Sequence, residues 1–158
     1  KEETLIQTQP IELTIAPDLH EKNRANYASR EQREKEERIR MVMEYCHYYL
    51  PRIADQETVN HICTEVDKWM NLNTYTPKPI QRPFTKDINN IPLRHFVWNI
   101  SERFLYKRYY NGDNRAKFIK ALFPKSFADT DLSTIKNFQG RAVKRRKIPI
   151  DEPENGQT

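Results

Sequence analysis

Residues 93–110, LRHFVWNISERFLYKRYY, constrain the fold of this chain more than any other stretch. Five apolar residues recur at i, i+3, i+4, i+7 and i+11, the spacing of one face of an amphipathic helix: Leu93, Phe96, Val97, Ile100 and Phe104. Trp98, Leu105 and Tyr109 fall on a second, nearly opposite stripe. Because a helix that is apolar on two sides is usually packed between other elements, the pattern predicts a central helix over residues 93–110.

The composition around this stretch favours helix over sheet. The 158 residues include only three glycines and many Lys, Arg, Glu and Gln. The sequence therefore predicts an all-α fold: a helical hairpin, a three-helix, helix-turn-helix-like basic module, and extended termini. The expected boundaries are an N-terminal arm at 1–22, the hairpin at 23–70, a Pro-rich connector at 71–92, the basic module at 93–140, and a basic run with a disordered tail at 141–158.

The hairpin is predicted to begin with a long helix over residues 23–50, which Pro51 stops. Its first half, SREQREKEERIR, is almost free of apolar residues and contains i, i+4 charge pairs such as Glu31/Lys35 and Glu34/Arg38. We expect this half to face solvent or a partner. The second half is expected to join the core through one stripe: Ile39, Val42, Met43, Cys46, Tyr49 and Leu50.

A second helix is predicted over residues 56–70, with Asp55 as its N-cap. Its buried stripe is very regular: Val59, Ile62, Cys63, Val66, Trp69 and Met70. The following connector contains Pro77, Pro79, Pro83 and Pro92, so it is expected to be extended and to mark a subdomain boundary. Tyr75, Ile80 and Phe84 are its expected packing residues.

The N-terminal arm has a period of two, since Ile11, Leu13 and Ile15 alternate with polar residues. This pattern predicts either one short strand, paired with residues 148–150 or another molecule, or an arm that becomes ordered only on binding. The sequence leaves both alternatives open.

Two short helices are predicted after the central one. Gly112 is expected to supply the positive φ that ends the central helix. A fourth helix then runs over residues 114–123, buries Phe118, Ile119 and Leu122, and stops at Pro124. A fifth helix is capped by Asp129 or Asp131, buries Leu132, Ile135 and Phe138, and ends at Gly140.

The net charge of +5 is concentrated in the C-terminal third. Residues 101–150 contain 13 Lys and Arg against 4 Asp and Glu, whereas residues 1–100 contain 14 against 15. A positive segment on a near-neutral body indicates a polyanionic partner, and nucleic acid is the commonest one. The alternative is a lysine-rich, solvated surface.

The predicted fifth helix is the first candidate for nucleic-acid contact. Ser133 and Asn137 lie opposite its apolar stripe, and Thr134 and Lys136 flank it. Such side chains can hydrogen-bond base edges or phosphates when a helix enters a groove, so this helix is the expected reader of a helix-turn-helix. The connector PKSFADT is longer than the usual three- to four-residue turn, and an ordinary capped helix with a solvated face is the alternative.

The basic run RAVKRRK is the second candidate, with expected phosphate contacts from Arg141, Lys144, Arg145, Arg146 and Lys147. It can equally be a nuclear-localisation-like patch or a solubilising tail. Further positive charge comes from Arg103, Lys107, Arg108, Arg115, Lys117 and Lys120, interleaved with Tyr106, Tyr109 and Tyr110. Such aromatics can stack on single strands, but we favour the interpretation that they are half-buried core residues.

Other classes of function are not favoured. The chain has no Gly-rich phosphate loop, nucleophile elbow or His-Glu-x-x-His pattern, so we expect neither an enzyme nor a cofactor. Cys46, His47, His61 and Cys63 have zinc-ligand chemistry, but both cysteines lie on apolar stripes, so no metal site is expected.

The expected environment is intracellular and cytoplasmic. Two cysteines in a helical domain of this size are typical of a reducing compartment without a disulfide framework. No apolar run approaches the roughly 20 residues of a membrane span, and the N-terminus has no signal-peptide pattern, so no membrane association is expected.

Residues 93–147 resemble the C-terminal domain of the RteC family, regulators of conjugative-transposon excision. The resemblance is carried by an apolar helix (FVWNISERFL), an Asn-Gly connector (YYNGDN), an aromatic helix (KFIKALF) and a segment running into basic residues (DLSTIKNFQGRAVKRRK). It covers about a third of the chain. It implies a winged-helix-like DNA-binding domain in a regulator of a mobile element.

Together these features predict a non-enzymatic nucleic-acid-binding protein, a DNA-binding regulator or accessory factor, with DNA favoured over RNA. The alternative is a helical adaptor or assembly subunit whose charged first helix and N-terminal arm bind a protein partner. The first hypothesis predicts that replacing residues 144–147 by Ala removes most nucleic-acid affinity. The second predicts that deleting residues 1–38 abolishes complex formation.

Overall fold

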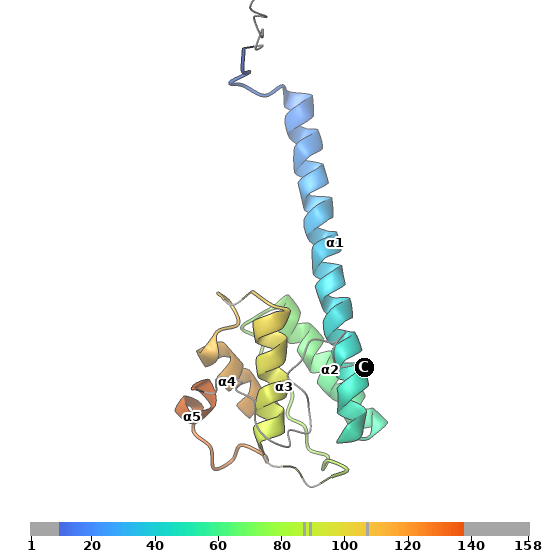
Figure 1. The fold of residues 1–158 in the computed structure, drawn as a ribbon, viewed down its shortest axis with the longest axis vertical. Helices are drawn as coiled ribbons and strands as arrows, with labels where there is room; N and C mark the ends of the chain where they lie inside the picture. Colours follow the sequence, from blue (N-terminus) through green and yellow to red (C-terminus); the bar gives the residue numbers. More distant parts are fainter. Residues whose placement is uncertain (1–9, 87, 89, 107, 138–158) are drawn as a thin grey trace, which may run out of the picture. The chain divides into compact units, whose positions relative to one another are not determined.

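The computed structural model describes residues 10–86, 88, 90–106 and 108–137, and over these residues the protein is all-α (Figure 1). The described chain contains five α-helices, one 3₁₀ helix and no strand, which confirms the predicted fold class. The elements are α1 Pro17–Tyr49, η1 Leu50–Arg52, α2 Gln56–Asn71, α3 Asn90–Arg103, α4 Gly112–Leu122 and α5 Leu132–Lys136.

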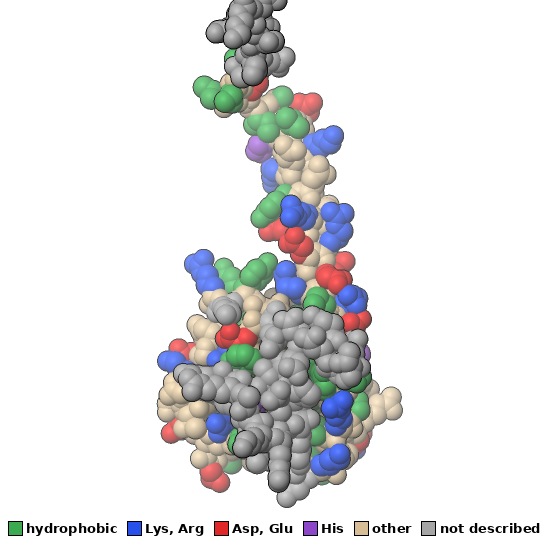
Figure 2. All heavy atoms as spheres, viewed as in Figure 1, with side chains coloured by type: hydrophobic (Ala, Val, Ile, Leu, Met, Phe, Trp, Pro, Cys, Tyr) green, Lys and Arg blue, Asp and Glu red, His purple; other side chains and the backbone are tan. Residues whose placement is uncertain are grey.

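The chain divides into two compact units, Lys1–Lys35 and Glu36–Thr158, and α1 contributes to both. In the first unit every described residue from 10 to 34 is exposed. Figure 2 shows basic and acidic side chains interspersed along this part of α1. Ion pairs at helical spacing join Arg24 to Glu21 and Arg30 to Glu34. The exposed, charged first half of the helix is therefore as predicted.

The start of α1 differs from the prediction. The helix begins at Pro17 and not near residue 23. Pro is well suited to the first turn of a helix. The negative charge of the neighbouring Asp18 interacts favourably with the positive end of the helix dipole. Ile11, Leu13 and Ile15 lie in irregular backbone and are exposed, so the described part of the arm is not a strand. Its suggested partner, residues 148–150, lies outside the described residues.

The second unit has one hydrophobic core, to which α1, α2, the connector, α3, α4 and α5 all contribute. Tyr45 of α1 stacks on Phe96 of α3, with ring centroids 5.8 Å apart. Trp69 of α2 stacks on Phe118 of α4, with centroids 4.1 Å apart. The predicted hairpin and the predicted basic module thus share a core within this unit.

The described residues between α2 and α3, 72–86 and 88, belong to the Pro-rich connector; they are irregular as expected and take part in this core. Ile80 is buried, and its N–H donates to the carbonyl of Leu122 at 2.8 Å. Tyr75 and Phe84 are partly buried against the core. The connector therefore joins the elements on either side of it, and the described residues do not separate into two cores there.

The start of α2 is as predicted. The side chain of Asp55 accepts a hydrogen bond from the Thr58 N–H at 2.8 Å, which satisfies one of the free donors of the first turn. Every residue of its predicted stripe is buried except Met70, which is partly buried.

The central helix α3 is shorter than predicted, because it ends at Arg103 and not at residue 110. The first predicted stripe is buried at every position, from Leu93 to Phe104. The second stripe is wrong: Trp98 and Leu105 are half-buried, and Tyr109 is exposed in the loop after the helix. Buried polar side chains occupy further positions of α3 instead: His95, Asn99 and Ser101.

The role of Gly112 also differs from the prediction. It does not end the central helix with a positive φ, since it is the first residue of α4. Asn111 is the N-cap, and its side chain accepts the Asn114 N–H at 3.0 Å. A Cβ at Gly112 would lie 3.2 Å from the carbonyl oxygen of Lys136, a tight contact, so glycine makes room for the close approach of α5 to α4.

The last two helices match the prediction in part. Phe118, Ile119 and Leu122 of α4 are buried as expected. Asp131, one of the two proposed caps, accepts the Thr134 N–H at 2.8 Å. The predicted stripe of the fifth helix is wrong at Leu132, which is 42% exposed, because α5 has only five residues and buries one, Ile135. Phe138 and Gly140 lie outside the described residues.

Candidate nucleic-acid interface

The four predicted contact residues of the fifth helix, Ser133, Thr134, Lys136 and Asn137, are all exposed at α5 and its C-cap. Ser133 Oγ donates to Asp131 Oδ1 at 2.9 Å, and Lys136 Nζ lies 3.1 Å from Asp113 Oδ1. Two carboxylates therefore flank this face.

The Asp131 carboxyl also keeps its negative charge. Hydrogen bonds from Thr134 and then from Ser133 hold its pKa below the ordinary value. A face with two carboxylates, one of them paired with its lysine, does not favour contact with a phosphate backbone.

The five predicted phosphate contacts of the basic run lie outside the described residues: Arg141, Lys144, Arg145, Arg146 and Lys147. Their contribution stays a prediction based on charge alone.

The remaining basic residues of the C-terminal third differ in whether their side chains are available to contact phosphate. Arg115 is 7% exposed, and its guanidinium lies 3.3 Å from the Glu102 carboxylate and donates to Ser101 Oγ at 3.1 Å. Burial lowers the pKa of Arg115, and the Glu102 charge raises it. Arg115 therefore ties α4 to α3 and is not free for phosphate. The Lys120 ammonium donates to the Thr130 carbonyl at 2.8 Å.

Arg108 and Lys117, by contrast, are exposed, whereas the side chains of Arg103 and Lys107 lie outside the described residues.

The loop of residues 104–111, between α3 and α4, exposes two aromatic rings. Tyr106 is 56% exposed and Tyr109 is 50% exposed. The Arg38 guanidinium lies over the Tyr106 ring at 4.7 Å from its centroid, and the Arg108 guanidinium lies over the Tyr109 ring at 5.6 Å. Figure 2 shows basic and hydrophobic side chains side by side over this loop. We name Arg38, Tyr106, Arg108 and Tyr109 the tyrosine–arginine surface.

Tyr110, the third tyrosine of the loop, holds it in place. Tyr110 is 6% exposed, and its hydroxyl lies 2.8 Å from the carbonyl oxygens of both Trp69 and Met70 at the end of α2, to which it donates. These carbonyls have no partner within a helix, so the hydroxyl satisfies them. Burial raises the pKa of Tyr110 to about 12, against a smaller lowering by the Arg38 charge, so the hydroxyl remains a donor at neutral pH.

The turn itself fixes the spacing of the exposed rings. The Tyr106 carbonyl accepts the N–H groups of Tyr109 at 3.0 Å and Tyr110 at 3.1 Å. This closed turn, together with the buried Tyr110, leaves Tyr106 and Tyr109 on the outside of the loop. The expectation of half-buried core tyrosines is therefore wrong for Tyr106 and Tyr109, which are exposed, whereas Tyr110 belongs to the core.

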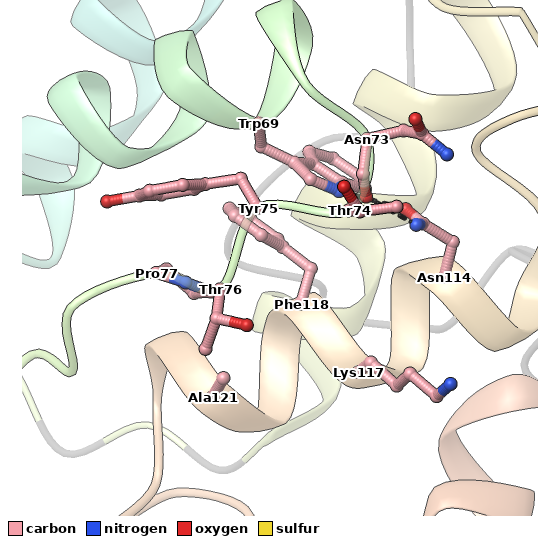
Figure 3. Close-up of a pocket in the computed structure, with 10 residues that line it drawn as sticks. All are labelled: Trp69, Asn73, Thr74, Tyr75, Thr76, Pro77, Asn114, Lys117, Phe118 and Ala121. Carbon is pink, nitrogen blue, oxygen red and sulfur yellow. Dashed lines mark hydrogen bonds between the residues drawn. The ribbon is translucent and has the colours of Figure 1, made fainter.

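A small pocket lies next to this loop, between the start of the connector and α4 (Figure 3). Its volume is about 190 Å³. Apolar walls come from Tyr75, Pro77, Phe118 and Ala121, and Trp69 also borders it. In Figure 3, Asn73 and Asn114 lie at one side of the pocket, and Pro77 and Ala121 at the other. The side chain of Asn73 donates to the Tyr109 carbonyl at 3.4 Å, so the pocket adjoins the tyrosine–arginine surface.

The pocket walls are held by a hydrogen-bond network between α2, the connector and α4. Trp69 Nε1 donates to Asn114 Oδ1 at 2.8 Å, and the Asn114 amide donates to the Asn73 carbonyl. On the other side, the buried Glu65 carboxylate accepts the Tyr75 hydroxyl at 2.7 Å and the Lys78 N–H. These bonds fix the connector at residues 73–78 against α2.

The charge of Glu65 follows from the same bonds. Burial raises the pKa of the carboxyl, but the Lys78 N–H and the Tyr75 hydroxyl lower it by more, with a further lowering by Lys68. Glu65 is therefore an ionised, buried acceptor that holds the structure together.

Metal-ligand chemistry has little geometric support in the part of the chain that the structure describes. It contains no group of three or more His, Cys, Asp and Glu side chains arranged to hold a metal ion. Cys46 and Cys63 are buried and free of disulfide bonds, and burial raises the pKa of the Cys46 thiol. Among the helices described, none combines the length and apolarity needed to cross a bilayer.

No protein-family model, curated protein or solved structure matches the chain. The resemblance of residues 93–147 to the RteC family is neither supported nor contradicted by these comparisons, so it stays a prediction.

Two features of this region escaped the sequence analysis: the exposure of Tyr106 and Tyr109, and the pocket. The sequence does not indicate which of the three tyrosines is buried, because the burial of Tyr110 depends on its contact with the end of α2. The pocket joins residues 69–77 to residues 114–121, and only a three-dimensional arrangement brings these segments together.

Proposed function

We propose that this protein binds nucleic acid without catalysing a reaction, and that single-stranded segments contact the tyrosine–arginine surface. The observation that carries the proposal is the pair of half-exposed rings, Tyr106 and Tyr109, each with a guanidinium over it. Aromatic rings among arginines are the usual platform for unpaired bases, because every base has a face that can stack. A DNA-binding regulator or accessory factor inside the cell is the biological role that fits the proposal.

The charge of the C-terminal third supports this proposal. Residues 101–150 contain 13 Lys and Arg against 4 Asp and Glu, and phosphate contacts make up most of the affinity of such proteins. Exposed Arg108 and Lys117 lie in and after the loop that presents the rings. The basic run extends the same positive charge along the chain.

The tyrosines have a direct test in the double variant Tyr106→Ala/Tyr109→Ala. One stacked base contributes about 1–3 kcal/mol, so we expect at least a tenfold loss of affinity for a fluorescently labelled single-stranded oligonucleotide. Tyr48→Ala is the matched control, since Tyr48 is 42% exposed and has the Arg52 guanidinium 5.3 Å from its ring centroid. The control should bind like the wild type. Equal loss in both variants, or none in either, contradicts the proposal.

The charge contribution is tested by salt. Affinity for single strands should fall linearly on a log–log plot of binding constant against salt, by about 0.7 per phosphate contacted. Replacing Lys144, Arg145, Arg146 and Lys147 by Ala should reduce that slope and remove most of the affinity at low salt. Binding that does not depend on salt contradicts this part of the proposal.

A second candidate function is supported by the first unit. Large apolar side chains are exposed along the arm and the start of α1: Ile11, Leu13, Ile15, Leu19 and Tyr27. Such residues close together in sequence and all exposed are typical of a segment that binds another protein. We therefore also propose that this segment is a protein-docking element, which is compatible with nucleic-acid binding elsewhere.

The docking element is tested by Ile11→Ser/Leu13→Ser/Ile15→Ser in the full chain. Proteins that co-purify from the native cell should be lost from this variant and retained by the variant of residues 144–147. A partner set that is unchanged by the serine substitutions contradicts the docking element.

A further inference from the structure

We propose that the pocket beside Tyr109 takes one unstacked nucleobase of the bound single strand. This inference rests on the proposed function and adds a binding site for one base of the proposed single-stranded ligand. The pocket is bounded by Tyr75, Pro77, Phe118 and Ala121, with Asn73 at the side that faces the tyrosine–arginine surface. The occupant is a planar, partly polar ring.

The size of the pocket favours a single ring system. Its volume of about 190 Å³ is below the range of roughly 300–1,000 Å³ that holds drug-sized ligands. A whole nucleotide with its sugar and phosphate would therefore extend out of it. A base inserted edge-first leaves its sugar and phosphate outside the pocket, and Lys117, an exposed lining residue, is the nearby cation.

The chemistry of the lining also fits a base. Aromatic and aliphatic walls accept its faces, and the hydroxyls of Thr74 and Thr76 can donate to or accept from its edge. The walls are fixed before binding, because Trp69 Nε1 is already bonded to Asn114 and the Tyr75 hydroxyl to Glu65. A preformed site avoids part of the entropy cost of ordering on binding.

The position of the pocket makes a base the fitting occupant. The Asn73 side chain donates to the Tyr109 carbonyl at 3.4 Å, so the pocket lining directly contacts the loop that exposes the two rings, and a strand stacked on them has the pocket next to it. An amino-acid side chain of a protein partner is the competing occupant, and the test below excludes one of the two.

The test fills the pocket with Ala121→Leu. Ala121 is a half-buried lining residue of α4, and Leu keeps the helix propensity high. The affinity of the full chain is measured for two oligonucleotides of equal length, one with normal bases and one that is abasic throughout. We expect Ala121→Leu to weaken binding of the normal strand about tenfold, within the range for one base, and to leave the abasic strand unchanged. Matched DNA and RNA strands distinguish the two sources of the base.

The control is Ala128→Leu, the same substitution at an exposed position between α4 and α5 that does not line the pocket. It should bind both strands like the wild type. If Ala121→Leu also binds both strands like the wild type, the base site is wrong. If Tyr106→Ala/Tyr109→Ala still weakens binding in that case, the proposed function stands without it. A wild-type protein that binds no strand overturns the proposed function itself.

A second measurement does not depend on the stability of the filled variant. In the background Trp98→Phe, Trp69 is the only tryptophan and borders the pocket. The normal strand should change the Trp69 emission, and the abasic strand at the same fractional saturation should not. An emission change of equal size with both strands, or with neither, overturns the base site.

Discussion

The two halves of α1 have the same secondary structure and opposite surroundings. From Pro17 to residue 34 every side chain is exposed, whereas Val42, Tyr45, Cys46 and Tyr49 further along the same helix are fully buried. A sequence can therefore form a stable-looking helix without carrying the apolar stripe that packs a helix against a core. The first half of α1 is helical because its residues have high helix propensity and form local charge pairs, but it has no packed face.

The two halves also differ in what stabilises them. Exposed ion pairs such as Arg30–Glu34, with side chains 72% and 51% exposed, contribute little to the free energy of unfolding. In the second half, burial of large aromatic rings dominates. We therefore assign stability to the second half, whereas partner contact by the first half stays a proposal. The second half also places Arg38 over Tyr106, so it supports the tyrosine–arginine surface.

The largest expected change in stability distinguishes the two halves of α1 directly. Tyr45 is 0% exposed and stacks on Phe96, whereas Tyr27 on the same helix is 63% exposed. Tyr45→Ala should lower the free energy of unfolding by about 3–5 kcal/mol, because it leaves a cavity in the core. Tyr27→Ala should change it by about 0.5 kcal/mol or less. Urea unfolding followed by circular dichroism measures both, and similar values for the two variants would contradict the contrast.

A smaller effect is expected at Glu65, which holds the connector to α2. Glu65→Gln should lower the free energy of unfolding at pH 7 by about 1–2 kcal/mol, since two hydrogen bonds lose a charged acceptor.

The pH dependence at Glu65 has a definite sign. The folded-state pKa of Glu65 is below its ordinary value, so its contribution is fully present above the unfolded-state pKa, about 4.3. That contribution is lost as the pH falls through the folded-state pKa. The stability difference between wild type and Glu65→Gln should therefore shrink between pH 7 and pH 3. A difference that grows on acidification would show that burial, and not hydrogen bonding, dominates at this carboxyl.

A loss of stability smaller than that at Glu65 is expected at Tyr110, which anchors the loop between α3 and α4. Tyr110→Phe removes the hydroxyl that satisfies the end of α2 and should cost about 1 kcal/mol of stability. The melting temperature in differential scanning calorimetry measures the change. No decrease would mean that the loop does not depend on this contact.

Much of the fold could be predicted because its signals are local. Asp55 and Asp131 cap their helices as their residue type predicts, and the stripes of α2 and α4 repeat at helical spacing. The errors arise where a local signal has two interpretations. Apolar residues continue the helical period past Phe104 although the helix ends at Arg103, and Gly112 resembles the end of a helix although Asn111 starts one.

For the candidate site, the sequence indicates only a general class of ligand, and that class stays a prediction. Charge distribution points to a polyanion, because net charge is a property of composition. The fifth helix was the natural first candidate, but its acidic neighbours are known only from the contacts of Lys136 with Asp113 and of Ser133 with Asp131. Which of Tyr106, Tyr109 and Tyr110 is buried depends on a contact with α2, some 40 residues earlier in the chain.

The position of nucleic acid on the protein surface can be measured by ultraviolet crosslinking of the full chain to a single-stranded oligonucleotide, with the attached peptides identified by mass spectrometry. We expect crosslinks to concentrate in the peptide that contains Tyr106 and Tyr109 and to decline as the salt concentration is raised. Crosslinks confined to residues 132–137 or to the first half of α1 would contradict this expectation, because the nucleic acid would then lie on a surface other than the tyrosine–arginine surface.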